Sequence, residues 1–362
     1  MKTITLLIQA FLIAVLSTYV AGHQCDHDFH QTRIGKVVPA IQQTHHHHAH
    51  PLAVDRLRIV ADYSNVYDPT KVCTKVGDVR TDFQGGTYTC TSDQIVTSAK
   101  IAYMKDTLMA PALAYLSSAL SVNQVPQNLS VSGATCDSAL TIPQAHMSYG
   151  VPNTDLVLYV TIAASSSAST LAWALYCATD TAGRPIVGHV NWNPNVLDPL
   201  AARASNQTNI NTAIHEIMHV LGFSKSYVDE YFPTKLNATK VVFKRGKNVT
   251  MVVTSEVIQK SREYYGCSTM EGLELEDQGG TGTALSHWEK RLVGPEAMSG
   301  VTYSSEIIPT ISNMTLAFFK DSGKYQVNYA AADNNNLFFG RNKGCPFVNE
   351  KCNASSVRDS FC

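Results

Sequence analysis

The segment NTAIHEIMHVLGFSKSY, residues 211–227, holds the side chains with the clearest chemistry in the chain. His215 and His219 are four residues apart, and Glu216 lies between them. On an α-helix this spacing brings both imidazoles to one face, where two nitrogens can bind one metal ion. Glu216, turned aside from that face, can act as the base that takes a proton from water. The pattern predicts the catalytic zinc site of a hydrolytic enzyme.

The helix that carries these residues must also pack against the rest of the protein. The apolar residues predicted to lie opposite the histidines are Ile210, Ala213, Ile214, Ile217, Met218 and Leu221. Gly222 follows, and a glycine at this position favours a left-handed turn that ends the helix. We therefore expect the helix to stop at Gly222 and the chain to pass beneath the metal.

A catalytic zinc ion takes three protein ligands and leaves one position for water. Only one histidine, His287, follows His219 in the sequence. A downstream carboxylate is the alternative third ligand, and the candidates are Glu256, Glu263, Glu271 and Glu274. We favour His287, because Gly222 indicates a turn in place of a continuing helix. His146 and His189 are predicted to have structural roles only.

The N-terminus is typical of a secreted protein. Residues 1–22 contain Lys2, an apolar stretch and a small-residue end suited to cleavage after Gly22, which predicts a signal peptide. A membrane anchor is the alternative, but Gln9 interrupts a stretch that is short for a span. No other segment approaches the ~20 apolar residues of a transmembrane helix. Residues 23–55 are polar and rich in histidine, so we expect a leader there.

Composition narrows the class of protein. The chain has 362 residues, 44% of them hydrophobic, and a net charge of −1, which predicts a globular protein of two or three units. The near-zero charge gives no electrostatic footprint for nucleic acid. The chain has 9 cysteines, and because this number is odd, pairing within the chain leaves at least one thiol over. Glycosylation sequons support a secretory route with disulfides, and they begin at Asn128, Asn206, Asn237, Asn248, Asn313 and Asn353.

Hydrophobic periodicity predicts a mixed α/β fold. Residues 92–120 are predicted as a packing helix bent near Pro111. Residues 154–164 and 184–194 are predicted as buried strands, and residues 241–254 as short strands around a basic turn.

Taken with these motifs, the chain resembles the leishmanolysin family of metzincin proteases, which occurs in protists and animals, and we expect a protist member. The strings that carry the resemblance are HQCDHD, NTDLVLYV, TLAWALYC, GRPIVG, the HEIMH helix, SHWEKR, DSGKY and FGRNKGCPF. The family inserts a long segment before its third histidine. The resemblance implies a metzincin-type α/β catalytic domain with an inserted irregular central domain, His287 as the third zinc ligand, and Met298 as the Met-turn residue.

The resemblance also implies roles for the cysteines. Cys25 stands where the family has a candidate cysteine switch, which ligates zinc in the latent precursor. The implied disulfides pair Cys73 with Cys90, Cys136 with Cys177 and Cys267 with Cys345. Cys352 and Cys362 then pair with each other or with partners beyond this sequence.

The expected organisation follows from these roles. It comprises a signal peptide (1–22), a propeptide (23–55), an N-terminal catalytic subdomain (56–222), a central subdomain (223–350) and the start of a missing or reduced C-terminal domain (351–362).

The expected function is that of a secreted or cell-surface zinc metalloendopeptidase, made as a zymogen and using one zinc ion. Its zinc-bound water would be activated by Glu216, and its substrates would be proteins. The alternatives are a zinc hydrolase completed by a glutamate ligand and a non-catalytic adhesion or surface protein of the same fold. Glu216 argues against the second, since a binding-only protein has no need of that base.

Overall fold

The computed structural model describes residues 31, 54–165, 170–201, 203–233, 237–280, 282–301, 310–333 and 336–356. The predicted signal peptide, Cys25, the histidine-rich tract and Cys362 lie outside the described residues. Within the described part of the chain, no helix is both long and apolar enough to cross a membrane.

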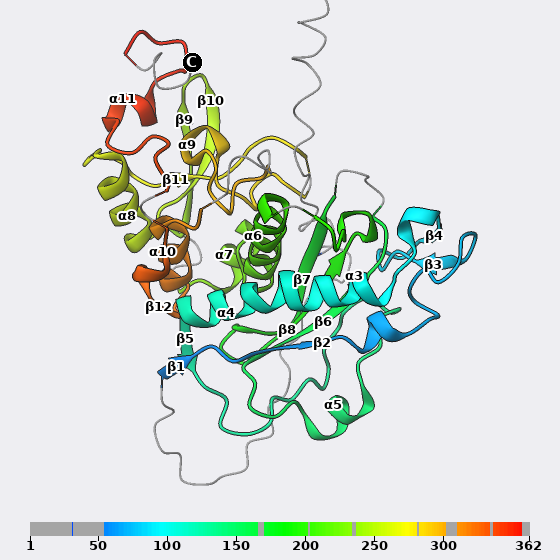
Figure 1. The fold of residues 1–362 in the computed structure, drawn as a ribbon. Coiled ribbons are helices and arrows are strands. Elements are labelled where there is room, and N and C mark those ends of the chain that lie inside the picture. The colour runs from blue at the N-terminus through cyan, green and yellow to red at the C-terminus, as the bar shows by residue number, and fades with distance from the viewer. Residues whose placement is uncertain are drawn as a thin grey trace, which may run out of the picture.

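A four-stranded sheet forms the centre of the first half of the protein (Figure 1). Its spatial order is β2-β6-β8-β7, and its strands are β2 (Ile59–Asp62), β6 (Leu156–Ile162), β8 (Pro185–Trp192) and β7 (Ala172–Thr179). β2, β6 and β8 run parallel, while β7 runs antiparallel to β8 at the edge. Every residue of β6, β7 and β8 is buried, as expected for strands covered on both faces. The two strands predicted at 154–164 and 184–194 are confirmed.

A long helical segment packs beside this sheet. It consists of α3 (Ser98–Ala102), the π-helical segment η3 (Tyr103–Met109) and α4 (Ala110–Ala119). The predicted start at residue 92 is wrong, because the Thr97 side chain caps the helix by accepting a hydrogen bond from the Lys100 amide. The irregularity lies before Pro111, whose ring lacks an N–H and crowds the preceding turn, so the wider π turns accommodate it.

The helix predicted around the two histidines is α6 (Arg203–Val220). It lies against β7 and β8 (Figure 1). Gly188 of β8 permits this close approach, since a Cβ added there would lie 2.4 Å from Cγ1 of Val220. The histidine side of the helix is covered as well, and residues 211–224 are all buried. The end of α6 is therefore buried on all sides.

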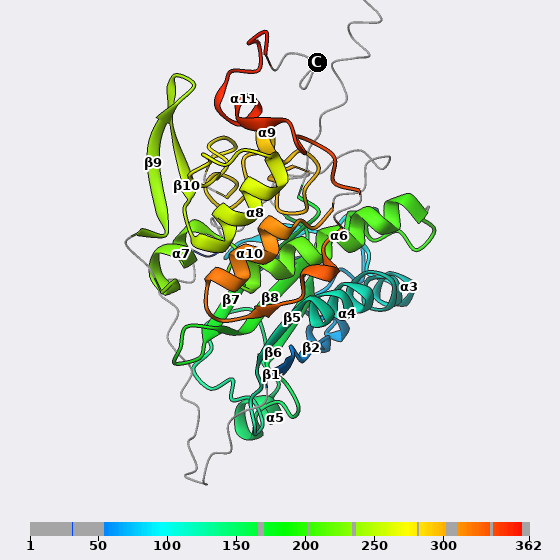
Figure 2. The ribbon, with the colours of Figure 1, turned by 90° about the vertical axis from the view of Figure 1, so that its left-hand side faces the viewer.

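The second half of the chain covers the other side of α6 (Figures 1 and 2). Its sheet has the order β11-β10-β9, made of β9 (Thr239–Lys244), β10 (Lys247–Val252) and β11 (Leu273–Glu274). The β9–β10 hairpin confirms the strands predicted around the basic turn, which is Arg245–Gly246. The helices are α7 (Lys225–Tyr231), α8 (Ser255–Tyr265), α9 (Lys290–Val293), α10 (Asn313–Asp321) and α11 (Gly344–Asn349).

Smaller elements complete the described fold. The strands are β1 (Val54–Arg56), β3 (Val79–Thr81), β4 (Thr87–Thr89), β5 (Leu120–Asn123) and β12 (Gln326–Val327). The helical turns are η1 (Ser64–Tyr67), η2 (Ser92–Gln94), α5 (Gln144–Tyr149), η4 (Pro194–Val196) and η6 (Tyr329–Ala331). β5 brings together two strands that are far apart in the sequence, since it pairs with β1 on one side and with β12 on the other.

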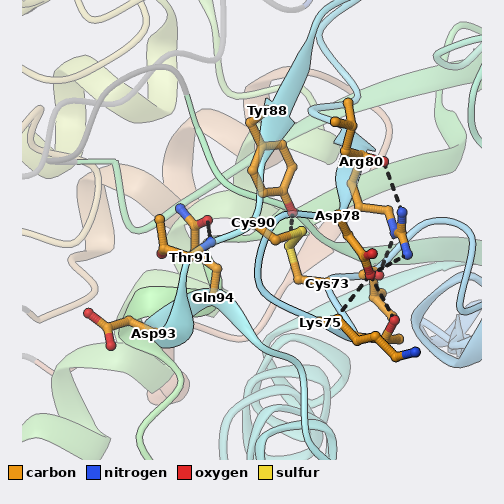
Figure 3. Close-up of a disulfide and its surroundings, with 12 residues drawn as sticks. Cys73, Lys75, Asp78, Arg80, Tyr88, Cys90, Thr91, Asp93 and Gln94 are labelled. Carbon is orange, nitrogen blue, oxygen red and sulfur yellow. Dashed lines mark hydrogen bonds and ion pairs between the residues drawn. A yellow bond between two sulfur atoms is a disulfide. The ribbon is translucent and has the colours of Figure 1, made fainter.

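Three disulfides link six of the described cysteines: Cys73–Cys90, Cys136–Cys177 and Cys267–Cys345. These are the pairs that the family resemblance implies. Figure 3 shows the first of them beside Tyr88, whose hydroxyl lies 3.4 Å from the Cys73 sulfur. Cys352 is exposed and forms no disulfide with another described residue. Its predicted pairing with Cys362 lies outside the described part of the chain.

Candidate metal centre

Three imidazole rings converge at the end of α6. The Nε2 atom of His219 lies 3.1 Å from that of His215 and 3.2 Å from that of His287, and the remaining Nε2 pair is 3.2 Å apart. His215 is 6% exposed, and the other two rings are fully buried. His287, which is 68 and 72 positions from the other two histidines in the sequence, thus joins them to place three nitrogens around one point.

The opposite nitrogen of each ring faces a backbone carbonyl oxygen. The Nδ1 atom of His215 is 2.6 Å from the Ala297 oxygen, that of His219 is 2.8 Å from the Phe223 oxygen, and that of His287 is 2.8 Å from the Thr283 oxygen. A carbonyl can only accept, so each Nδ1 donates a proton to it. In the neutral rings the lone pairs are therefore on the three converging Nε2 atoms.

Three converging lone pairs repel one another unless a cation lies among them. The arrangement is that of a metal site in which carbonyl partners fix the tautomer and the orientation of each ligand. Borderline-soft nitrogen donors of this kind suit zinc. The donor set therefore fits a zinc ion held by three histidines.

The turn after α6 holds the second histidine. The amide of Gly222 donates to the His219 carbonyl, and that of Phe223 donates to the Met218 carbonyl, both at 3.0 Å. These two bonds form a Schellman motif, which requires positive φ at the glycine, and Gly222 has φ +108°. The predicted end of the helix is confirmed. The turn also brings the Phe223 carbonyl back to Nδ1 of His219.

His287 comes from an extended segment that is paired on both sides. The amide of Glu276 donates to the His287 carbonyl at 2.9 Å, and the amide of Trp288 donates to the Met298 carbonyl at 2.9 Å. Trp288 is fully buried and donates its ring N–H to the Thr315 hydroxyl at 2.9 Å. The backbone thus fixes the third histidine from two neighbouring segments.

The segment that contains Met298 contacts His215 through its backbone. Met298 is fully buried, and the carbonyl of the preceding residue, Ala297, accepts from His215. Glu296 anchors this segment, because its carboxylate accepts from the Met298 amide at 2.5 Å and from the amide and hydroxyl of Ser312 at 3.0 and 2.8 Å. Burial raises the pKa of Glu296, while these hydrogen bonds and one from Thr315 oppose the rise.

Glu296 was not predicted as a site residue. A lone glutamate two positions before a methionine carries no spacing signal, and its role depends on Ser312 and Thr315 at the start of α10. A second group that the sequence did not reveal lies around His287: Glu276, Asp277 and Glu289 approach one another. Burial and the charge of Glu276 raise the pKa of Glu289 to about 7.

The glutamates considered as alternative third ligands all have other partners. Their partners are Lys320 and Tyr329 for Glu256, Lys260 for Glu263, Lys240 for Glu271, and Lys244 and Arg245 for Glu274. Among the described residues, the histidine cluster contains His215, His219 and His287 and no glutamate. His189 lies within the first sheet, where its Nε2 is 2.8 Å from the Thr161 hydroxyl, and Nδ1 of His146 is 3.1 Å from the Tyr159 hydroxyl.

Glu216 lies in the same turn of α6 as the two histidines and is fully buried. Its carboxylate is therefore on the element that supplies two of the three rings. Cys25 lies outside the described residues, so its role as a switch stays a prediction.

Comparison with known proteins decides the family. The family model for leishmanolysin matches residues 24–362. The chain belongs to the leishmanolysin family. This is a family of zinc metallopeptidases, which agrees with the donor set derived from the three histidines.

Individual members of the leishmanolysin family show the extent of the likeness. Leishmanolysin of Leishmania major is 35% identical over 312 residues, which is 83% of this chain and 48% of that protein. Leishmanolysin of Leishmania donovani is 31% identical over 356 residues, or 91% of this chain and 57% of that protein. The leishmanolysin-like peptidase of Drosophila melanogaster is 36% identical over 242 residues, or 56% and 34%. The chain thus spans about half the length of the Leishmania proteins it matches.

Proposed function

We propose that this chain is a zinc metalloendopeptidase whose metal ion is held by His215, His219 and His287. The observation that carries the proposal is the convergence of three Nε2 atoms at 3.1–3.2 Å, each on a ring whose Nδ1 donates to a backbone carbonyl. Membership of the leishmanolysin family supports the choice of zinc and of a peptide bond as the target.

Zinc, when bound, polarises a scissile carbonyl and lowers the pKa of a water molecule to about 7. Glu216 is proposed as the general base that removes a proton from the attacking water and passes it to the leaving amine. Its place on α6 between two ligand histidines supports this role, since the helix fixes all three side chains relative to one another.

The surrounding residues are proposed to hold the ligands in place. Met298, on the segment that receives the His215 N–H, is proposed as the Met-turn residue of a metzincin-type site. It acts by packing, because a buried thioether there shapes the floor of the site without ligating the metal. Gly222 supplies the turn that orients His219.

The substrates proposed are proteins, and the proposed route is secretory. Three disulfides support an oxidising compartment, because such bonds persist in secreted and surface proteins and are rare in the cytosol. The zymogen, with a propeptide at 23–55 and Cys25 as its switch, is also a proposal, which rests on the family resemblance of the sequence HQCDHD.

The ligand assignment is tested by replacing the distant histidine. His287→Ala should abolish stoichiometric zinc binding, while the fold is kept because disulfides and the sheets hold the scaffold. Zinc content by mass spectrometry and secondary structure by circular dichroism are measured after leader removal. His146→Ala is the matched control, since His146 bonds Tyr159 away from the centre and should leave one zinc ion per chain. Full zinc occupancy in His287→Ala would overturn the assignment.

A further inference from the structure

The β9–β10 hairpin carries an apolar patch that the described part of the fold leaves exposed. β9 is the last strand of the second sheet, and among the described strands only β10 pairs with it. The hairpin stands at the outside of the molecule (Figure 2). Val241 is 62% exposed and Phe243 is 75% exposed. Because side chains alternate along a strand, these two lie on the same face of β9. Exposed apolar side chains on an edge strand favour aggregation unless something covers them.

A glycosylation sequon lies directly opposite this apolar pair. The sequon begins at Asn248 and ends at Thr250, both on β10. The antiparallel register places Asn248 opposite Phe243. In the same register Thr250 lies opposite Val241. Residues that are directly opposite share a face of the sheet, with Cβ atoms about 4.5–5.5 Å apart. Asn248 is exposed, whereas Val249, which points to the other face, is buried. The acceptor asparagine therefore projects from the same face as the two apolar side chains.

The chemistry of an N-linked sugar fits this face. The first sugar of an N-glycan is joined to the asparagine Nδ2, so its ring lies within reach of the side chain opposite, which here is Phe243. One face of that sugar carries C–H groups, which pack on the negative face of an aromatic ring. The hydroxyl groups of the glycan face water, so an apolar surface is replaced by a polar one. The bulk of the glycan also keeps a further strand away from the β9 edge.

We propose that Asn248 carries an N-linked oligosaccharide whose first sugar packs on Phe243 and covers the apolar face of the hairpin. In the transfer, Nδ2 of Asn248 forms a bond to the anomeric carbon of a lipid-pyrophosphate-linked oligosaccharide and loses one proton to water. The bond from that carbon to the phosphate oxygen breaks, and the lipid pyrophosphate leaves with the electron pair. The modification rests on the proposed secretory route, because the sugar donor is met there, and it does not depend on the metal centre.

The first measurement is the occupancy of Asn248 in the full chain expressed in animal cells with its own residues 1–22. Peptide N-glycosidase in heavy-oxygen water converts each glycosylated asparagine to a labelled aspartate, and mass spectrometry of the peptides reads the label. We expect Asn248 to be labelled. A bare Asn248 beside labelled sequons elsewhere in the chain would overturn this proposal alone. A chain without a label at any sequon would contradict the secretory route as well.

The second measurement tests whether the glycan covers Phe243. Amide hydrogen exchange of residues 239–252 is compared in the wild type, Asn248→Gln, Phe243→Thr and the double variant. Loss of a cross-strand contact should raise exchange roughly 1.5- to 5-fold in Asn248→Gln, and by less in the Phe243→Thr background. Ser130→Ala removes the sequon at Asn128 and is the matched control, which should leave the hairpin unchanged.

Three results would overturn the covering role of the glycan. They are unchanged exchange in Asn248→Gln, an equal rise in the two Phe243 backgrounds, and a rise of the same size in Ser130→Ala. If Asn248→Gln is not secreted, peptide N-glycosidase removes the glycan from the folded wild-type and Phe243→Thr chains, and the same comparison decides.

Discussion

Gly222→Ala is expected to damage the metal centre from a distance, and its cost can be worked out from the structure. The left-handed backbone at φ +108° costs a residue with a Cβ about 1–2 kcal/mol. The added Cβ would also lie 2.6–2.8 Å from three atoms of the Tyr227 ring. That ring cannot move away readily, because its hydroxyl donates to the Gly183 carbonyl at 2.7 Å and the side chain is fully buried. Overpacking of this kind adds about 1–3 kcal/mol.

The sum is about 2–5 kcal/mol, and each kcal/mol lowers the Tm of a domain of 150–250 residues by about 2–4 °C. Gly77→Ala is the matched control, because Gly77 has φ +87° but no atom within 4 Å of an added Cβ. It should show the backbone cost alone, about 1–2 kcal/mol. Because the Phe223 carbonyl orients His219, Gly222→Ala should also weaken zinc binding about 10–100-fold, and Gly77→Ala should not.

The assays are thermal unfolding and zinc competition with a chelator. Equal Tm losses in the two variants, or unchanged zinc affinity in Gly222→Ala, would refute the argument that this turn is fitted against Tyr227 and positions the ligand.

Two further predictions concern charge and latency. Burial opposes ionisation of Glu274, but hydrogen bonds from Arg245 and the charges of Lys244 and Arg245 outweigh it and lower its pKa below 4.5. A carboxyl group whose pKa is lower in the folded than in the unfolded chain stabilises the fold at pH values above its unfolded pKa, and this stabilisation is lost as the pH falls through the folded pKa. Glu274→Gln should therefore lower the free energy of unfolding at pH 7, and the difference from the wild type should disappear below pH 4.5. Denaturant titrations at the two pH values measure it. If Cys25 holds the precursor latent, Cys25→Ser should make the unprocessed chain cleave casein at once, since a hydroxyl is a poorer zinc ligand than a thiolate. A disulfide between Cys25 and Cys352, found by non-reducing peptide mapping, would contradict that switch.

The helix α6 and its end were predictable because they depend on local spacing. His215 and His219 are about one helical turn apart, and Gly222 favours the left-handed backbone that ends a helix. Both predictions therefore rest on the local sequence and do not require the tertiary fold. The buried strands β6 and β8 were predictable for a similar reason, since continuous apolar runs are a local signal.

His287 was a different case, because it reaches the other histidines from 68 residues away. The sequence left it in competition with four glutamates, and family resemblance favoured it. What places His287 in the structure is pairing with the segments at Glu276 and Met298, and no local pattern encodes such pairing. The anchoring role of Glu296 was invisible for the same reason.

The helix boundary at Ser98 shows where local reasoning failed although the signal was present. Thr97 is a favourable N-cap residue, but the helix was predicted to begin at residue 92. The chain instead makes the separate turn η2, fixed by Thr91 and Gln94 in a capping box next to the Cys73–Cys90 disulfide (Figure 3). Tertiary constraints thus outweighed the helical pattern over residues 92–97.

The central claim is that a zinc ion held by three histidines and a base on the same helix together hydrolyse peptide bonds. The most direct measurement is zinc content and casein cleavage of the leader-free chain, for the wild type, Glu216→Gln and the exposed control Glu263→Gln. The account predicts one zinc ion per chain in all three, with cleavage reduced by at least about 100-fold in Glu216→Gln alone, because a general base contributes 10²–10⁴-fold. Cleavage at the wild-type rate by zinc-loaded Glu216→Gln, or a wild-type chain that binds zinc and cleaves nothing, would contradict it.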